Sequence, residues 1–208
     1  MTNENTHHTR PSRIARRLPL VVAIGAAALM IAPATGMAAS AKFGAAVNPQ
    51  LQPSNSVPAH DCDAAPGSKC TWVLNDAYQN AGGEGSPHKG TLKKIKLVAG
   101  EPGSFKLQVV KMKPGNRAKV TRNGPKINYD GQPVAFDEPY NVEKFKVDVP
   151  IKQGEYLAIK AKTTSMVRCS GGGDNTLLYA PPLKKGDSFR TANEDEGCFL
   201  LMQGVVKY

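Results

Sequence analysis

Histidine and aromatic residues are scarce in this chain of 208 residues. It has four histidines, and aromatic side chains make up 6% of it. His7 and His8 lie in an N-terminal stretch with the pattern of an export signal, so the exported chain would keep only His60 and His88. A nucleophilic serine needs a base to take its proton. Because no histidine follows His88, we interpret Gly186-Asp187-Ser188 as a turn.

Arginine is also rare after the N-terminal stretch. The rest of the chain has only Arg117, Arg122, Arg168 and Arg190. Lysine therefore supplies most of the positive charge of a chain whose formal net charge is +10. Recognition of nucleic acids favours arginine forks and aromatic rings on which bases stack. The composition thus disfavours a specific nucleic-acid partner and leaves other polyanions open.

The first 41 residues predict a signal peptide. Four arginines precede the apolar residues 18–32, and Ala39-Ser40-Ala41 fits the small-x-small pattern of a cleavage site, with Gly36-Met37-Ala38 as a second candidate. The apolar stretch is short for a bilayer span, which favours cleavage over an uncleaved anchor. We expect a secreted protein with no transmembrane segment after cleavage, exported by the general secretory or the twin-arginine route.

The remaining chain is predicted to be one domain behind a tether. Residues 42–61 are rich in Pro, Asn and Ser, which favours a flexible tether, and residues 62–208 are enough for one core. All four cysteines follow residue 61. An even number of cysteines in an exported domain predicts disulfides, and closeness in sequence favours Cys62–Cys70 and Cys169–Cys198. Their spacing disfavours zinc.

Alternating apolar and polar residues recur along the domain, with Gly, Pro and Asn between the runs. The pattern predicts strands at residues 70–78, 92–99, 105–112, 118–122, 142–151, 155–163, 176–179 and 198–207. The fold class is therefore all-β, an antiparallel β-sandwich of jelly-roll type with about eight strands, and a closed barrel is the alternative. Residues 142–163 are interpreted as a hairpin that turns at Gly154.

Lysines carry the strongest functional signal. If the apolar positions face inward, the period of two sends a set of lysines outward. Such a surface would attract anionic wall polymers, phospholipid head groups or released nucleic acid. It would equally keep the strands soluble and prevent edge pairing. The set comprises Lys94, Lys96, Lys106, Lys144, Lys146 and Lys160, among which Tyr156 alternates.

A carbohydrate-binding module is the main alternative. Tyr129 and Tyr140 lie in the predicted loop 123–140, where their rings would be available to stack on a sugar. Trp72 follows Cys70 by two residues and is expected to pack in the core against the disulfide.

A glycan hydrolase is a less favoured hypothesis. Asp130, Asp137 and Glu138 offer carboxylates for acid and base chemistry, but a solvated loop accounts for them equally well. Calcium ligands are suggested only weakly, by Asp61 and Asp63 or by Asp174 and Asn175. We predict no enzyme activity, no cofactor and no metal site.

Four segments together resemble a loose group of secreted actinobacterial proteins: KCTWV (69–73), Gly90-x-Leu92, VDVPIKQGEYLAIK (147–160) and APPLKKGDSF (180–189). The resemblance covers about residues 62–208 and implies one signal peptide and one β-sandwich. The chain departs from the group at Glu155, where Asp is usual, and at Tyr156-Leu157-Ala158, where a glycine is frequent. No activity is established for the group, so no site residue is carried over.

These patterns predict a secreted, non-catalytic β-sandwich associated with the cell envelope. Its expected partner is an anionic wall polymer or a glycan. The oligomeric state and the ligand stay open, as does the question of whether the lysines gather in one patch, because strand order is invisible in the sequence.

Overall fold

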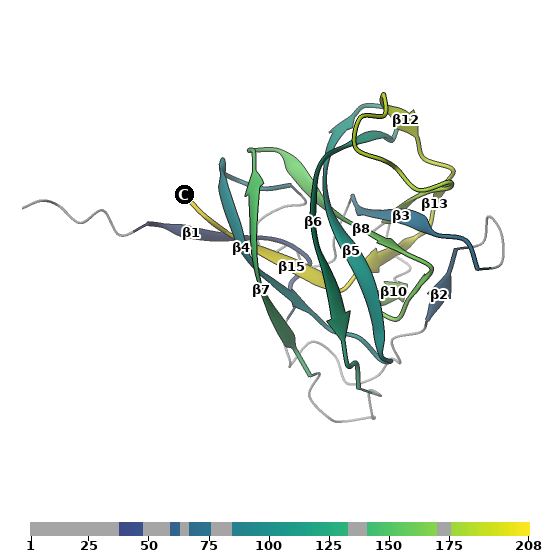
Figure 1. Ribbon diagram of the computed structural model, residues 1–208, viewed down its shortest axis with the longest axis horizontal. Coiled ribbons are helices and arrows are strands. Elements are labelled where there is room, and N and C mark those ends of the chain that lie inside the picture. Colours follow the sequence, from purple (N-terminus) through teal and green to yellow (C-terminus); the bar gives the residue numbers. More distant parts are fainter. Residues whose placement is uncertain (1–37, 48–58, 63–66, 76–84, 133–140, 170–175) are drawn as a thin grey trace, which may run out of the picture. The chain divides into compact units, whose positions relative to one another are not determined.

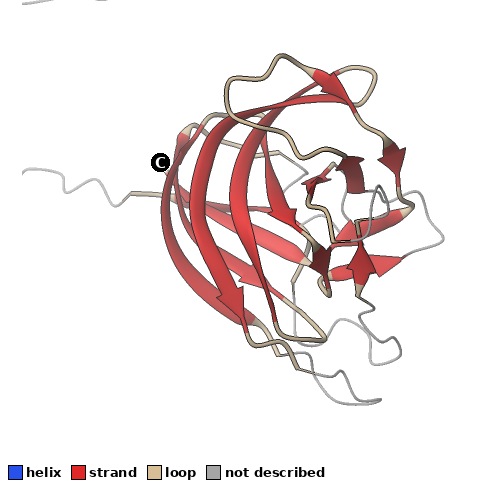
Figure 2. Cartoon of the chain, turned by 45° about the vertical axis from the view of Figure 1, so that its right-hand side comes forward, coloured by secondary structure: helices blue, strands red, loops and turns tan. Residues whose placement is uncertain are grey.

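The computed structural model describes residues 38–47, 59–62, 67–75, 85–132, 141–169 and 176–208, and the regular structure of these residues is all strand (Figure 2). Two antiparallel sheets dominate, one of four strands and one of seven. Side chains from both sheets meet in one hydrophobic core. The predicted antiparallel β-sandwich is therefore confirmed.

The four-stranded sheet has the order β1-β15-β4-β7, and the seven-stranded sheet has the order β12-β6-β5-β8-β3-β11-β13 (Figure 1). The former consists of β1 (Ser40–Gly44), β15 (Met202–Lys207), β4 (Gly90–Leu97) and β7 (Glu143–Ile151). The latter consists of β12 (Arg190–Thr191), β6 (Arg117–Tyr129), β5 (Gly103–Lys113), β8 (Glu155–Ala161), β3 (Cys70–Leu74), β11 (Thr176–Tyr179) and β13 (Glu194–Asp195). Two short ladders pair β2 (His60–Asp61) with β9 (Thr163–Thr164), and β10 (Val167–Cys169) with β14 (Cys198–Leu200).

The segment predicted as a hairpin is instead a crossover between the two sheets. Both strands exist and Gly154 makes the turn with a φ of 71°, a left-handed conformation that glycine adopts without strain. However, β7 pairs with β4 and β8 pairs with β5 and β3. Alternation reports which side of a strand is buried but not which strand lies beside it. Lysines of β7 and β8 therefore belong to different surfaces.

The seven-stranded sheet buries side chains on both of its faces. Along β8, Leu157 and Ile159 point into the core shared with the other sheet. Ala158 points the opposite way, into a second cluster over which Leu183 packs from the segment after β11. Lys160 shares the direction of Ala158 by the strand's period of two. This outer face is thus apolar over one part and lysine-rich over another.

The first described strand begins inside the predicted signal peptide and continues into the predicted tether. β1 pairs with β15 from Ser40 onward, and Phe43 is fully buried in the core. A cut after Ala41 would remove two residues of this strand, whereas a cut after Ala38 would keep it whole. The proline-rich composition of residues 48–58 concealed the short alternation before it, and residues 48–58 lie outside the described part.

Other boundaries also differ from those predicted. β6 continues to Tyr129, well beyond the expected end at residue 122. Residues 198–207 form two strands, β14 and β15, which pair in different sheets on either side of Leu201. The residues on both sides of Leu201 are apolar, so the sequence pattern shows no break at this change of sheet.

The cysteines behave as disulfide formers. Cys62 and Cys70 are bonded, with their Cα atoms 5.7 Å apart, which confirms the first predicted pairing. Cys198 is also disulfide-bonded. Its backbone partner across the β10–β14 ladder is Cys169, the juxtaposition that the second predicted pairing requires.

Candidate functional site: two basic surfaces

Four of the predicted site lysines come together on the outer side of the four-stranded sheet. Lys94 of β4 lies opposite Lys146 of β7, and Lys96 lies opposite Lys144. β1 adds Lys42, whose cross-strand partner Val205 is itself paired with Lys94. We call this surface the β4–β7 face; it consists of Lys42, Lys94, Lys96, Lys144 and Lys146.

The charges of the β4–β7 face repel one another. Lys96 is the least exposed of the five lysines, and its pKa is lowered from the usual value of 10.5, first by burial and then by the charges of Lys42, Lys144 and Lys94. Beside it, Lys93 Nζ and Asp148 Oδ1 form an exposed ion pair at 2.6 Å. An exposed pair of this kind contributes little to stability.

Lys160 lies on the other sheet. It is the cross-strand partner of Lys106 on β5, and Lys106 is in turn the partner of Lys126 on β6. Three lysines therefore stand in one row across three neighbouring strands. Cβ atoms of directly opposite residues lie roughly 5 Å apart in antiparallel pairs.

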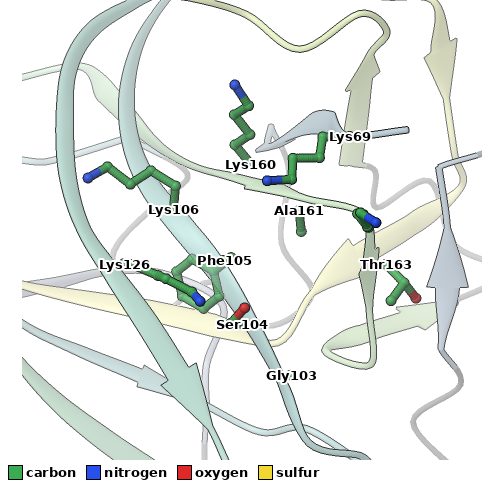
Figure 3. Close-up of a pocket in the computed structure, with 10 residues that line it drawn as sticks. Lys69, Gly103, Ser104, Phe105, Lys106, Lys126, Lys160, Ala161 and Thr163 are labelled. Carbon is green, nitrogen blue, oxygen red and sulfur yellow. The ribbon is translucent and has the colours of Figure 1, made fainter. Parts of the chain in front are cut away.

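This row borders a groove of about 590 Å³ at one end of the seven-stranded sheet (Figure 3). Lys69, from the segment entering β3, and Lys162, just after β8, also line it, and Ser104 adds a hydroxyl. No acidic side chain occurs among the described residues that line it. We call this surface the β5–β8 groove; its lysines are Lys69, Lys106, Lys126, Lys160 and Lys162.

The β5–β8 groove continues into a second hollow of about 360 Å³. The two hollows share Lys106 and Lys160, and the second adds Lys184 and Lys185 from the loop after β11. Both added lysines are exposed. The positive charge therefore extends in one continuous strip from the entrance of β3 to this loop.

A buried polar network fixes the second hollow. Gln108 of β5, 2% exposed, accepts a hydrogen bond from Thr71 Oγ1 (2.9 Å) and donates to Asn123 Oδ1 (3.2 Å) and to the carbonyl of Leu183 (3.3 Å). The N–H of Leu183 donates to Thr71 Oγ1 at 3.0 Å. These bonds tie the loop that carries Lys184 to the floor of the sheet.

The row of lysines opposes folding. Like charges directly opposite each other in a sheet are destabilising, by roughly the 0.2–1 kcal/mol that a favourable cross-strand pair contributes. Lys106 faces a lysine on each side, and no carboxylate is among the described lining residues to offset the repulsion. An anion placed in the β5–β8 groove would relieve it.

Tyr129 is not available for the predicted sugar platform. Tyr129 is a strand residue, 4% exposed, and packs against Phe105 with ring centroids 6.1 Å apart. Its position in β6 corrects the expectation that it lies in a loop. Tyr140 lies outside the described residues. Tyr156 is half-buried against the outer apolar cluster, and Trp72 is fully buried in the shared core as expected.

The carboxylates are scattered in the described structure. Asp130 is exposed at the end of β6, and Asp137 and Glu138 lie outside the described residues. Glu155 is 4% exposed and bonded to Arg122 at 2.6 Å and to the N–H of Lys152 at 2.7 Å, a structural arrangement at the crossover turn. Within the described ranges, no three His, Cys, Asp or Glu side chains gather in a way that could hold a metal ion.

Sequence reasoning missed most of the β5–β8 groove. It placed Lys160 and Lys106 outward but did not include Lys69, Lys126 or Lys162. Lys126 was not included because residues 123–140 were predicted to be a loop. Lys69 and Lys162 lie just outside strands, so alternation says nothing about them, and the high lysine content is the only signal that could have pointed to these two residues.

Comparisons with known proteins add no relative. No protein-family model, curated protein or solved structure matches the chain. Among the residues that the structure describes, none forms a helix with the length and apolar character needed to cross a membrane.

Proposed function

We propose that this chain is an exported, non-catalytic binding protein that holds an anionic polymer of the cell envelope in the β5–β8 groove. The observation that carries the proposal is the row of Lys126, Lys106 and Lys160, directly opposed across three strands in a groove whose described lining has no carboxylate. A chain that accepts this energetic cost at one place is expected to gain binding there.

The kind of side chain supports a phosphate-bearing polymer. Lysine acts as a mobile point charge and binds phosphate without demanding one geometry, whereas arginine forks favour fixed, bidentate recognition. The groove is lined by lysines and the hydroxyl of Ser104, and the ring of Phe105 beneath them is 2% exposed. The described lining of this groove therefore offers no exposed aromatic ring on which a base or a sugar could stack.

Two observations support a site of action outside the cytoplasm. The N-terminal pattern is that of an export signal, and the Cys62–Cys70 bond is of a kind that persists in oxidising compartments. The nearest polyanions in that setting are the polymers and head groups of the envelope. An electropositive groove would raise their local concentration.

The test compares two variants of equal charge. The oxidised protein, purified from a host that exports the full chain, is sedimented with isolated bacterial envelopes over a salt series. The groove variant carries Lys106→Gln, Lys126→Gln and Lys160→Gln. Each lysine that neutralises a phosphate on a single-stranded polyanion contributes about 0.7 to the slope of log affinity against log salt. We expect the groove variant to reduce this slope by about 2.

The matched control carries Lys89→Gln, Lys111→Gln and Lys152→Gln, three exposed lysines that line neither the β5–β8 groove nor the β4–β7 face. It should bind like the wild type. Equal losses in both variants would show that net charge alone drives binding, and a wild-type protein that stays in the supernatant at low salt would refute the proposal.

A further inference from the structure

The second basic surface lies on the other sheet. The β4–β7 face belongs to the four-stranded sheet and the β5–β8 groove to the seven-stranded sheet, and the inward residues of both sheets meet in one core. Side chains on the outer sides of two sheets that share a core project away from each other. Figure 1 shows β4 and β7 toward the left of the view and β6 and β5 to their right.

The border between the two surfaces brings a carboxylate among the cations. A hollow of about 360 Å³ lies where β6 and β7 approach each other, and Asp148 is the one carboxylate among the described residues that line it. Lys185 and Arg122 also line this hollow, and Arg122 is already paired with Glu155 at 2.6 Å. The Asp148 side chain is 74% exposed even though it pairs with Lys93. A polyanion crossing from one surface to the other would meet this carboxylate, so a single continuous path is disfavoured.

Like charges oppose each other across strands on the β4–β7 face, as they do in the β5–β8 groove. Lys94 opposes Lys146 and Lys96 opposes Lys144, so two like-charged pairs stand side by side. Solubility alone would be served as well by lysines alternating with acids along these strands. The repeated opposition of like charges therefore points to an anionic partner on this sheet too.

We infer that one molecule holds two separate polyanion chains, one in the β5–β8 groove and one on the β4–β7 face, and thereby crosslinks them. This inference rests on the proposed function, since it assigns a second, independent site of the same chemistry. Simultaneous engagement on two surfaces would give the protein a linking role within a phosphate-bearing polymer network. Where the two bound chains belong to one linked network, the second binding event is effectively intramolecular and raises the overall affinity without new contacts.

The probe is linear inorganic polyphosphate. Long chains are fixed to beads, the oxidised protein is added and washed, and a second, fluorescent polyphosphate is then offered. Retention of protein on the beads measures the first binding event at either surface, and the part of its salt slope that is lost in the groove variant measures the proposed function. Capture of the fluorescent chain measures crosslinking alone.

Three variants separate the sites. The groove variant (Lys106, Lys126 and Lys160 to Gln) and a face variant (Lys94, Lys144 and Lys146 to Gln) should each remain on the beads but capture at least about tenfold less of the second chain than the wild type. The control variant (Lys89, Lys111 and Lys152 to Gln) should capture it like the wild type. Amounts of bead-bound protein are equalised before the second chain is added.

Four outcomes would overturn the inference. Full capture by either single-surface variant would mean that the protein crosslinks as an oligomer using one surface. A wild-type protein that stays on the beads without capturing a second chain would leave one site, and the proposed function is kept only if the groove variant loses that binding. Binding of the wild type but not of the face variant to vesicles with equal parts phosphatidylglycerol and phosphatidylcholine, without polymer capture, would assign the β4–β7 face to membrane. Loss of all bead binding would overturn both proposals.

Discussion

The two basic surfaces are made of the same residue type in different surroundings. The β5–β8 groove is concave, its described lining has no acid, and a buried network around Gln108 fixes its continuation. The β4–β7 face is an array of opposed lysines with an ion pair of Lys93 and Asp148 beside it, and its most buried lysine has a lowered pKa. Under the proposed function, the concave groove would enclose a polyanion chain, and the open face would lie against one.

A third group of cations shows what a structural use of lysine is in this fold. At the β5–β6 hairpin, Lys113 and Lys119 lie over the ring of Phe189, with their Nζ atoms 4.3 and 4.9 Å from its centre. Such contacts contribute about 0.5–1 kcal/mol at exposed sites. These two lysines have a compensating partner within the chain. The three-lysine row has none among the described residues that line its groove, and this difference supports the proposal that the row binds a ligand.

Loss of β1 from the four-stranded sheet is expected to have the strongest effect on the β4–β7 face. Phe43 is fully buried in the shared core, so Phe43→Ala should lower the free energy of unfolding by about 3–5 kcal/mol. The strand would then separate from β15 and take Lys42 away from the β4–β7 face. Urea denaturation gives the stability, and the bead assay gives the effect on each surface. Lys42→Gln keeps the strand while removing its charge and should leave stability within about 0.5 kcal/mol.

A loss below about 1 kcal/mol for Phe43→Ala would mean that β1 is not part of the cooperatively folded sheet. The Lys42 contribution to the β4–β7 face would then be incidental. The β5–β8 groove should keep its affinity for the first chain in either case, provided the assay is run well below the denaturation midpoint.

Gln108→Ala is expected to change the β5–β8 groove and to leave the β4–β7 face as it is. This change leaves the carbonyl of Leu183 without its donor and the hydroxyl of Thr71 without its acceptor in a buried place, which costs about 1–3 kcal/mol in unfolding free energy. The loop that carries Lys184 and Lys185 then keeps only the bond from the Leu183 N–H to Thr71 Oγ1 out of this network, so affinity for polyphosphate should fall while the β4–β7 face is unaffected. Chemical denaturation and the salt series measure the two effects.

Asn123→Ala is the matched control, because Asn123 is exposed and accepts a single bond from the Gln108 amide. It should cost less than Gln108→Ala and leave the loop in place. Equal losses in the two variants would show that the network does not hold the loop through Leu183.

Sequence patterns predicted the faces of strands better than their neighbours. Period-two alternation placed Phe105, Leu107, Leu157 and Ile159 in the core and Lys160 outward, because burial of one side leaves a direct record in the sequence. It also placed the lysines of β4 and β7 on the outward side of their strands, but it left open whether they gather in one patch. It could not show that β7 and β8 lie in different sheets, since a turn at Gly154 serves a hairpin and a crossover equally well.

The missed parts have similar causes. β1 was not predicted because five residues give too short a pattern beside a proline-rich stretch. The groove was not predicted because its lysines come from distant segments that only strand order brings together. Lys69 and Lys126 are 57 positions apart in the sequence. Sites assembled on a sheet in this way carry no local motif.

The smallest expected effect concerns the charge balance of the β4–β7 face. The folded protein lowers the pKa of Lys96 below 10.5, through burial and through Lys42, Lys144 and Lys94. Between the lowered folded value and the unfolded value, the unfolded chain binds more protons, so stability rises with pH through this window. At neutral pH the charged Lys96 opposes folding, and Lys96→Gln should therefore stabilise the protein slightly and remove this part of the alkaline rise. Urea midpoints from about pH 8 to 11, compared with those of Lys89→Gln, measure the difference. If the two variants gave parallel curves, the repulsion would be screened in solution, and the β4–β7 face would lose the energetic evidence that marks it as a binding surface.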